Sequence, residues 1–181
     1  MKRIVLATAL AGMAVTAQAA TIDLNLSNES VRAEYDAPLP QTRLNLSVGG
    51  MYHEEDNADA TLLHAGLHTQ ENMAQYSMGV GAKGYWLNAD GVNGFAVGLG
   101  GQGSFSVPQL PLVRFGGHLY FAPKVTSFSD LDGLTDMSIR ASYQALRDVD
   151  VYLGWRKVST DIKGNDSSLD KGFNIGFVMN F

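Results

Sequence analysis

The last eleven residues of the chain, Lys171–Phe181, alternate between apolar side chains and small or polar ones. The apolar positions are Phe173, Ile175, Phe177, Met179 and the C-terminal Phe181. A side-chain period of two is typical of a β-strand, because successive residues point to opposite faces of a sheet. This segment therefore predicts a strand with one completely apolar face that ends on an aromatic residue.

The opposite end of the chain has the features of an export signal. The first three residues carry two positive charges, residues 4–16 are mostly apolar, and residues 17–19 follow a small-x-small cleavage pattern. We predict a secretory signal peptide over residues 1–19, cleaved after Ala19. A retained membrane helix is the alternative, but the apolar run is shorter than the roughly 17 residues that a spanning helix needs.

The remaining residues, 20–181, have the size of one domain. The whole chain has a net charge of −5, which makes a nucleic-acid partner an unfavourable hypothesis. The absence of cysteine excludes a disulfide framework and a lipid-anchored lipoprotein. Twenty glycines and five prolines fit many strands joined by turns.

Ten segments after the signal show the period of two. They are residues 22–26, 31–35, 44–52, 63–67, 76–86, 95–99, 113–121, 137–145, 151–155 and 173–181. Ten antiparallel strands return the C-terminus to the side of the N-terminus and leave the two longest connections, residues 123–135 and 159–170, on the other side. Eight strands stay open, because residues 22–26 are fewer than the roughly nine that a tilted spanning strand needs.

Aromatic residues on the apolar face gather near the ends of these segments. Tyr52, Trp86, Phe95, Phe121, Trp155 and Phe173 occupy the ends away from the termini, and Tyr35, Tyr76 and Phe181 occupy the near ends. Aromatic rings favour the two interfaces of a membrane. This sorting favours a membrane barrel over a soluble sandwich or lipocalin-like barrel, which would share the period of two. The sheet must close, because lipid offers no partner to an open strand edge.

The sequence thus predicts an all-β fold, an antiparallel up-and-down barrel of about ten strands in the bacterial outer membrane. The C-terminal strand resembles the closing strand of such barrels. We therefore expect its apolar face to be the assembly signal that the barrel-assembly machinery recognises. That signal consists of Phe173, Ile175, Phe177, Met179 and Phe181.

The whole chain resembles the YfaZ family of small outer-membrane proteins. The segments that carry the resemblance are Asp23–Leu26, Ser30–Tyr35, Gly117–Pro123, Ser127–Asp130 and Gly172–Phe177. The resemblance implies an outer-membrane barrel, sometimes described as porin-like. It supplies no catalytic residues.

The polar positions opposite the apolar face predict the lining of the barrel lumen. The charged and histidine members are Arg32, Glu34, His64, His68, Lys83, Arg114, His118, Arg140, Asp150 and Arg156. Five of these are basic and two are acidic, which favours a narrow pore with a weak preference for anions. The alternative is a plug of paired charges, because a barrel of about eight strands leaves room only for side chains, and unpaired buried charges are unfavourable.

Enzymatic activity is not expected. The histidines could act with Asp150, Ser77 or Ser138 as in a hydrolase, but no nucleophile motif marks either serine. A metal site at His64 and His68 would need a third ligand. We expect neither a cofactor nor a metal.

The connections predicted to lie outside the cell are acidic. Their acids are Glu54, Glu55, Asp56 and Asp59, then Asp130, Asp132 and Asp136, then Asp161, Asp166 and Asp170. Carboxylates bind hard divalent cations, so calcium could link these loops to lipopolysaccharide. An adhesion or binding module acting through these loops is the alternative to a porin-like or structural barrel. The solute, the ligand and the oligomeric state stay open at this stage.

Overall fold

The computed structural model describes residues 19–55, 58–89, 92–162 and 165–181. Residues 1–18 of the predicted signal peptide and Asp56 lie outside these ranges, so the cleavage after Ala19 stays a prediction. Within the described ranges, no helix is both long enough and apolar enough to cross a bilayer.

The described residues form β-strands almost throughout. In chain order the elements are β1 (Thr21–Ser27), β2 (Ser30–Pro38), β3 (Leu44–Glu55), β4 (Ala58–Thr69), β5 (Glu71–Asn72), β6 (Tyr76–Ala89), β7 (Val92–Val107), β8 (Leu110–Ala122), the short 3-10 helix η2 (Lys124–Thr126), β9 (Ser127–Ser129), β10 (Leu131–Leu146), β11 (Val149–Ile162) and β12 (Asn165–Asn180). All pairings are antiparallel, and β5 and β9 are short additions to β6 and β7.

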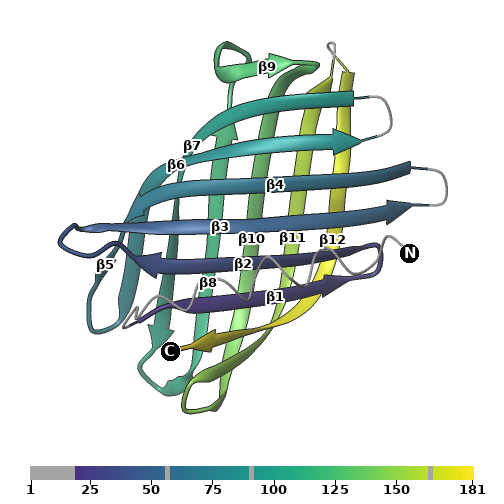
Figure 1. Ribbon diagram of the computed structural model, residues 1–181. Helices are drawn as coiled ribbons and strands as arrows, with labels where there is room; N and C mark the ends of the chain where they lie inside the picture. Colours follow the sequence, from purple (N-terminus) through teal and green to yellow (C-terminus); the bar gives the residue numbers. More distant parts are fainter. Residues whose placement is uncertain (1–18, 56–57, 90–91, 163–164) are drawn as a thin grey trace.

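The other ten strands close into a barrel (Figure 1). The first strand pairs with the last, from Thr21 opposite Asn180 to Ser27 opposite Asn174. On its other edge β1 pairs with β2, and β6 pairs with both β4 and β7. The prediction of ten strands is therefore confirmed. The eight-strand alternative is wrong, because β1 is short but pairs with β12 along its whole length and with β2 from Thr21 to Leu26.

The predicted loop over residues 159–170 is wrong. In the structure β11 continues to Ile162 and β12 begins at Asn165, with Ser159 opposite Ser168 and Thr160 opposite Ser167. The backbone ladder holds this hairpin together. Ser159, Thr160, Asp161, Ser167 and Ser168 are all polar, so the period of two that marks the rest of the strands is missing here.

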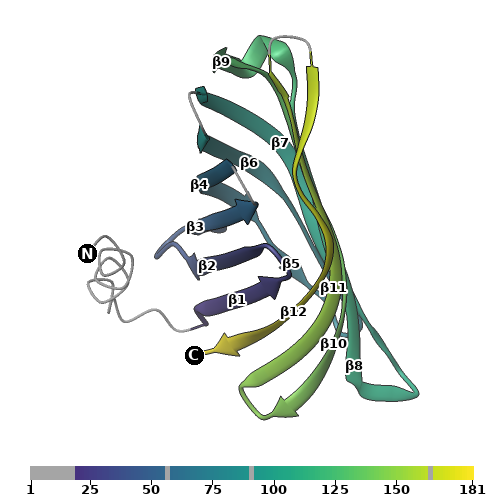
Figure 2. The ribbon, with the colours of Figure 1, turned by 90° about the vertical axis from the view of Figure 1, so that its right-hand side faces the viewer.

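The connection between β8 and β10 covers an open strand edge. Strand β7 extends beyond its partner β8, whose pairing begins at Leu99 opposite Phe121. Strand β9 pairs with the uncovered part, placing Phe128 opposite Phe95. Figure 2 shows β9 beside the end of β7 at the rim away from the C-terminus. An unpaired edge would be unfavourable, particularly near lipid.

The outer surface of the barrel is apolar and exposed. Phe173, Ile175, Leu153 and Leu99 all have at least 57% of their surface exposed, although they belong to paired strands. The residues that alternate with them are buried or half-buried and mostly polar or glycine, such as Asn174. A soluble barrel has the opposite arrangement. The outer surface is therefore built to contact lipid.

Candidate functional site

The interior of the barrel has three levels, and the first is an apolar cluster at the end away from the termini. Its buried members are Met51, Ala60, Leu62, Tyr85, Leu87, Ala96, Tyr120, Ala122, Leu131, Leu134, Val158 and Leu169. These residues come from eight strands around the barrel. The interior is therefore lined by buried apolar side chains at this level.

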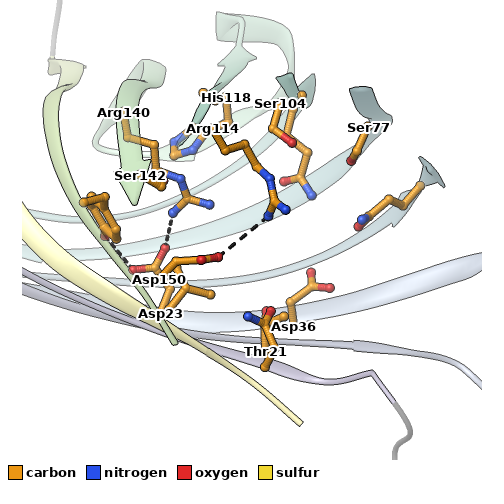
Figure 3. A pocket seen from close by; sticks show the side chains of 18 of the residues that line it. Thr21, Asp23, Asp36, Ser77, Ser104, Arg114, His118, Arg140, Ser142 and Asp150 are labelled. Carbon is orange, nitrogen blue, oxygen red and sulfur yellow. Dashed lines mark hydrogen bonds and ion pairs between the residues drawn. The ribbon is translucent and has the colours of Figure 1, made fainter. Parts of the chain in front are cut away.

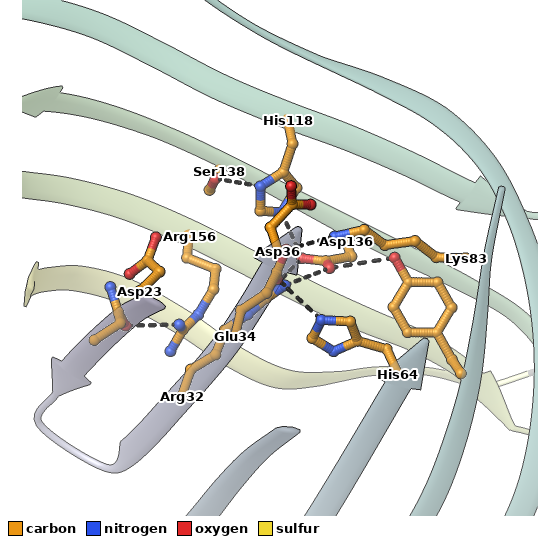
Figure 4. A network of polar contacts seen from close by, with 12 residues as sticks. Asp23, Arg32, Glu34, Asp36, His64, Lys83, His118, Asp136, Ser138 and Arg156 are labelled. Atoms are coloured by element: carbon orange, nitrogen blue, oxygen red, sulfur yellow. Dashed lines mark hydrogen bonds and ion pairs between the residues drawn. The ribbon is translucent and has the colours of Figure 1, made fainter. Parts of the chain in front are cut away.

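The second level is a network of buried charges, drawn in Figure 4. Arg32 on β2 donates two hydrogen bonds across the barrel to Asp136 on β10, each 3.2 Å long. Asp136 is completely buried, and Arg32 is nearly so. Tyr85 donates a further hydrogen bond to Asp136, at 3.3 Å. A bidentate pair of an arginine and a carboxylate fixes both geometry and charge.

Glu34 joins the basic side chains of three strands. Its carboxylate accepts hydrogen bonds from Arg32 and from Lys83, both at 3.1 Å. His64 Nε2 lies 2.9 Å from the same carboxylate. Further along the same strands, His68 Nε2 on β4 lies 3.3 Å from the Asp36 carboxylate on β2. It also lies 3.1 Å from the Gln102 amide on β7. Every charge at this level thus has an opposite charge within reach.

Two glycines of the inner face create the space for this network. A Cβ atom at Gly49 would lie 2.6 Å from the His64 ring, and one at Gly66 would lie 2.5 Å from the Lys83 stem. Both distances are far too short for non-bonded carbon atoms. Glycine at these positions lets the side chains of His64 and Lys83 lie against the inner surface of the neighbouring strand.

A second polar network ties the closing seam of the barrel. The Asn25 amide on β1 donates to Asn174 on β12, at 2.7 Å, and to the Tyr152 hydroxyl on β11, at 2.9 Å. Arg156 donates to Asn25 at 2.7 Å and to Asp170 at 2.6 Å. These hydrogen bonds join the first strand to the last two, at the seam where β1 meets β12.

The third level is a polar cavity of about 730 Å³ at the end where the termini lie (Figure 3). Arg140 on β10 and the Tyr152 hydroxyl both hydrogen bond to Asp23 on β1. Arg114 on β8 reaches Asp150 at 3.7 Å, with 55% of its side chain still exposed. Among the described residues, the cavity lining and the apolar cluster have no member in common. The cavity is therefore a vestibule that ends at the charged network.

The predicted lumen residues occupy the two inner polar levels. Arg32, His64, His68, Lys83 and Arg156 are buried inside the barrel wall. Arg32, Glu34, Arg114, His118, Arg140, Asp150 and Arg156 line the cavity. The residues predicted as the assembly signal, Phe173, Ile175, Phe177, Met179 and Phe181, are exposed on the outer surface. Among the described residues, no group of three or more His, Asp or Glu side chains could hold a metal ion.

Two acids predicted to lie in outer loops lie inside the barrel instead. Asp136 is the centre of the charged network, and Asp170 binds Arg156. Both belong to strands, because β10 and β12 extend further than predicted. Glu54, Asp59 and Asp161 are exposed, but they belong to the strands β3, β4 and β11 and not to loops as predicted.

The predicted excess of basic groups in the lumen is therefore wrong. Four further acids face inward, namely Asp23, Asp36, Asp136 and Asp170. With Glu34 and Asp150, they balance the five arginine and lysine side chains. Asp136 could have been found from the sequence, because it continues the inward alternation of Ser138 and Arg140 by one step.

Comparison with known proteins identifies the family. The sequence profile described as YfaZ precursor matches residues 1–181, which is the whole chain. The chain belongs to the YfaZ family. The resemblance noted in the sequence is thus confirmed. A search of curated proteins found no match.

The solved structures that match this YfaZ-family chain include outer-membrane proteins. A bacterial polysaccharide outer membrane secretin matches with a TM-score of 0.54 and 10% identity, covering 84% of this chain and 55% of that one. The outer membrane channel DcaP of Acinetobacter baumannii matches at 0.47 and 11%, covering 88% and 54%. The KdgM porin matches at 0.47 and 10%, covering 90% and 99%. The chain spans about half the length of the first two proteins.

The closed barrel, its apolar outer surface and the family together identify a porin-like β-barrel of the bacterial outer membrane. Outer-membrane barrels have an even number of strands, with short turns on the periplasmic side. The longest connection among the described residues, between β8 and β10, lies at the rim away from the C-terminus. That rim is the external side, and the polar vestibule opens towards the periplasm.

Proposed function

We propose that this protein is a closed structural barrel, porin-like in fold, that does not conduct ions in its resting state. The observation that carries the proposal is the order in which the vestibule, the charged network and the apolar cluster follow one another inside the barrel. A solute that enters the vestibule from the periplasm meets the paired charges of Arg32, Glu34 and Asp136 and then the apolar cluster. A ten-stranded barrel is close to the size at which side chains fill the interior.

The balanced charge of the lumen supports this function over an anion pore. Rings of unpaired basic side chains make a pore select anions, but the inner basic groups here each have an acidic partner. Arg140 binds Asp23, Arg114 reaches Asp150, and Arg156 binds Asp170. Breaking such pairs is unfavourable, so the plug resists opening.

Planar-bilayer recordings test the closed state. We expect the purified wild-type barrel to insert without discrete conductance steps under a salt gradient, while an open porin in the same membrane gives steps. Protease protection and heat-modifiable migration confirm that the silent protein is inserted and folded. Reproducible unitary steps from the wild type contradict the proposal, and their reversal potential then gives the selectivity of the pore.

Three side chains next to the vestibule are arranged like the serine, histidine and aspartate of a hydrolase triad. The Ser138 hydroxyl lies 2.9 Å from His118 Nδ1, and His118 Nε2 lies 3.0 Å from Asp136. This arrangement favours serine hydrolase activity as a second candidate function. In a working triad the carboxylate stabilises the imidazolium that forms during catalysis. Here Asp136 is already bound by Arg32 and Tyr85, so we assign these contacts to the structural network.

A fluorophosphonate probe distinguishes the two roles of Ser138. We expect no labelling of the folded barrel, because His118 and Asp136 hold the charged network and do not activate the hydroxyl. The matched control is Ser138→Ala, which lacks the hydroxyl and keeps the fold. Labelling of the wild type that disappears in Ser138→Ala establishes a reactive serine and favours the hydrolase. Equal background labelling of both chains supports the structural role.

A further inference from the structure

Two lysines lie directly opposite each other on the outer surface of the barrel. Lys157 on β11 and Lys171 on β12 are partners in the antiparallel ladder. They continue the outward alternation of Trp155 and Phe173. Lys171 is exposed, and Lys157 is half-buried. Like charges at directly opposed positions destabilise a sheet. An anion bound between the two ammonium groups would remove this repulsion.

The neighbouring acids do not neutralise these lysines. Asp170 precedes Lys171 in the chain but points inward and binds Arg156. On β10, Lys157 is paired with Met137. The preceding residue, Asp136, also points inward and binds Arg32. Within the described residues, neither Lys157 nor Lys171 has a recorded ion pair. Lys124 at the same rim differs, because it pairs with Asp132 at 3.1 Å.

The lysine pair lies at the level of the lipid headgroups. The apolar outward face of β12 runs from Phe173 to the chain end at Phe181. That is the length that a tilted strand needs to cross the hydrocarbon core, about nine to eleven residues. The pair of Trp155 and Phe173 marks its external end, where aromatic rings favour the interface. Lys157 and Lys171 follow one alternation step further out.

We propose that Lys157 and Lys171 bind a phosphate group of an anionic lipid in the external leaflet. The phosphate would lie between the two ammonium groups, and the acyl chains of the lipid would pack along Trp155 and Phe173. In the external leaflet of the outer membrane, the lipid of this chemistry is the phosphorylated glycolipid lipid A. The proposal rests on the outer-membrane location and on the periplasmic position of the termini. It does not depend on whether the lumen conducts.

Native mass spectrometry of the folded, full-length mature barrel tests the site. The probe is bis-phosphorylated lipid A in neutral detergent, with EDTA present to exclude calcium bridging by the loop acids. We expect the double variant Lys157→Gln/Lys171→Gln to bind lipid A about tenfold to thirtyfold more weakly than the wild type. The control Lys124→Gln, whose lysine already has an acidic partner, should change binding less than twofold. Equal losses in both variants overturn the proposal.

Two further probes identify the group that is recognised. Dephosphorylated lipid A should bind the wild type as weakly as intact lipid A binds the double variant, because the acyl chains remain but the charge is gone. Millimolar inorganic phosphate should compete weakly, since it lacks the acyl contacts. Equal binding of both lipids overturns phosphate recognition. Full displacement by inorganic phosphate overturns the lipid and indicates a site for free anions.

The variant Lys157→Glu separates binding from stability. It creates a favourable cross-strand pair with Lys171, so the thermal midpoint of unfolding in neutral detergent should rise. Lipid A binding should fall at the same time. A higher midpoint with unchanged binding overturns the proposal. Outer-membrane fractionation and heat-modifiable migration of each variant show separately whether location and fold are intact.

Discussion

Replacing Arg32 with alanine should lower the free energy of unfolding by about 3 to 5 kcal/mol. The substitution removes both hydrogen bonds that cross the barrel to Asp136, which is completely buried. The remaining partners of Asp136, His118 and Tyr85, cannot replace a permanent positive charge. A buried carboxylate that loses its cation is among the most destabilising single changes. Equilibrium urea unfolding in lipid vesicles measures the effect.

The double variant Arg32→Ala/Asp136→Ala tests the cause of this loss. Because it removes the stranded carboxylate as well, it should be more stable than the sum of the two single variants predicts. The control Lys124→Ala breaks an exposed pair with Asp132 and should change stability by no more than about 1 kcal/mol. Strict additivity of the two interior variants would mean that Arg32 and Asp136 do not depend on each other.

The strands could be predicted because lipid and a wet lumen impose opposite demands on successive residues. Leu153 must be apolar and its neighbours small or polar, so the period of two appears in the sequence. Where one of these demands ends, the period ends as well. Residues 159–170 extend beyond the lipid and were predicted as a loop, although the backbone ladder continues there.

The apolar cluster could not be predicted from the alternation. Leu62 and Leu87 point inward, next to Leu63 and Trp86, which point outward. A strand that is apolar on both faces gives neighbouring apolar residues and no period of two. The doublets Leu62–Leu63 and Trp86–Leu87 are the signal that was available. Once the strands that contain these doublets are known, the doublets indicate the level at which apolar side chains fill the lumen.

The pairing of side chains in the charged network could not be predicted from the sequence either. The parity of each strand predicts that Arg32 and Glu34 face inward, and they do so. The pairing of Arg32 with Asp136, 104 residues away, depends on the stagger of strands on opposite walls of the barrel. Stagger accumulates around the whole sheet, so no local pattern contains it.

The second large effect on stability is expected from a charge placed on the outer, lipid-facing surface of the barrel. Leu153 is 57% exposed on the outer surface and lies between Ala141 and Ile175 of the neighbouring strands. Placing arginine there puts a charge among hydrocarbon chains. We expect Leu153→Arg to lower the free energy of unfolding in vesicles by about 2 to 4 kcal/mol.

The matched control places the same side chain inside the barrel. Ser104 lines the vestibule, where an added guanidinium stays in contact with water and with the carboxylates of the lining, so Ser104→Arg should have a clearly smaller effect. In detergent without a bilayer the difference between the two variants should shrink, because micelles adapt to a surface charge more readily than a bilayer. A harmless Leu153→Arg beside an unfolded Ser104→Arg would reverse inside and outside. The apolar residues would then form the core of a soluble barrel.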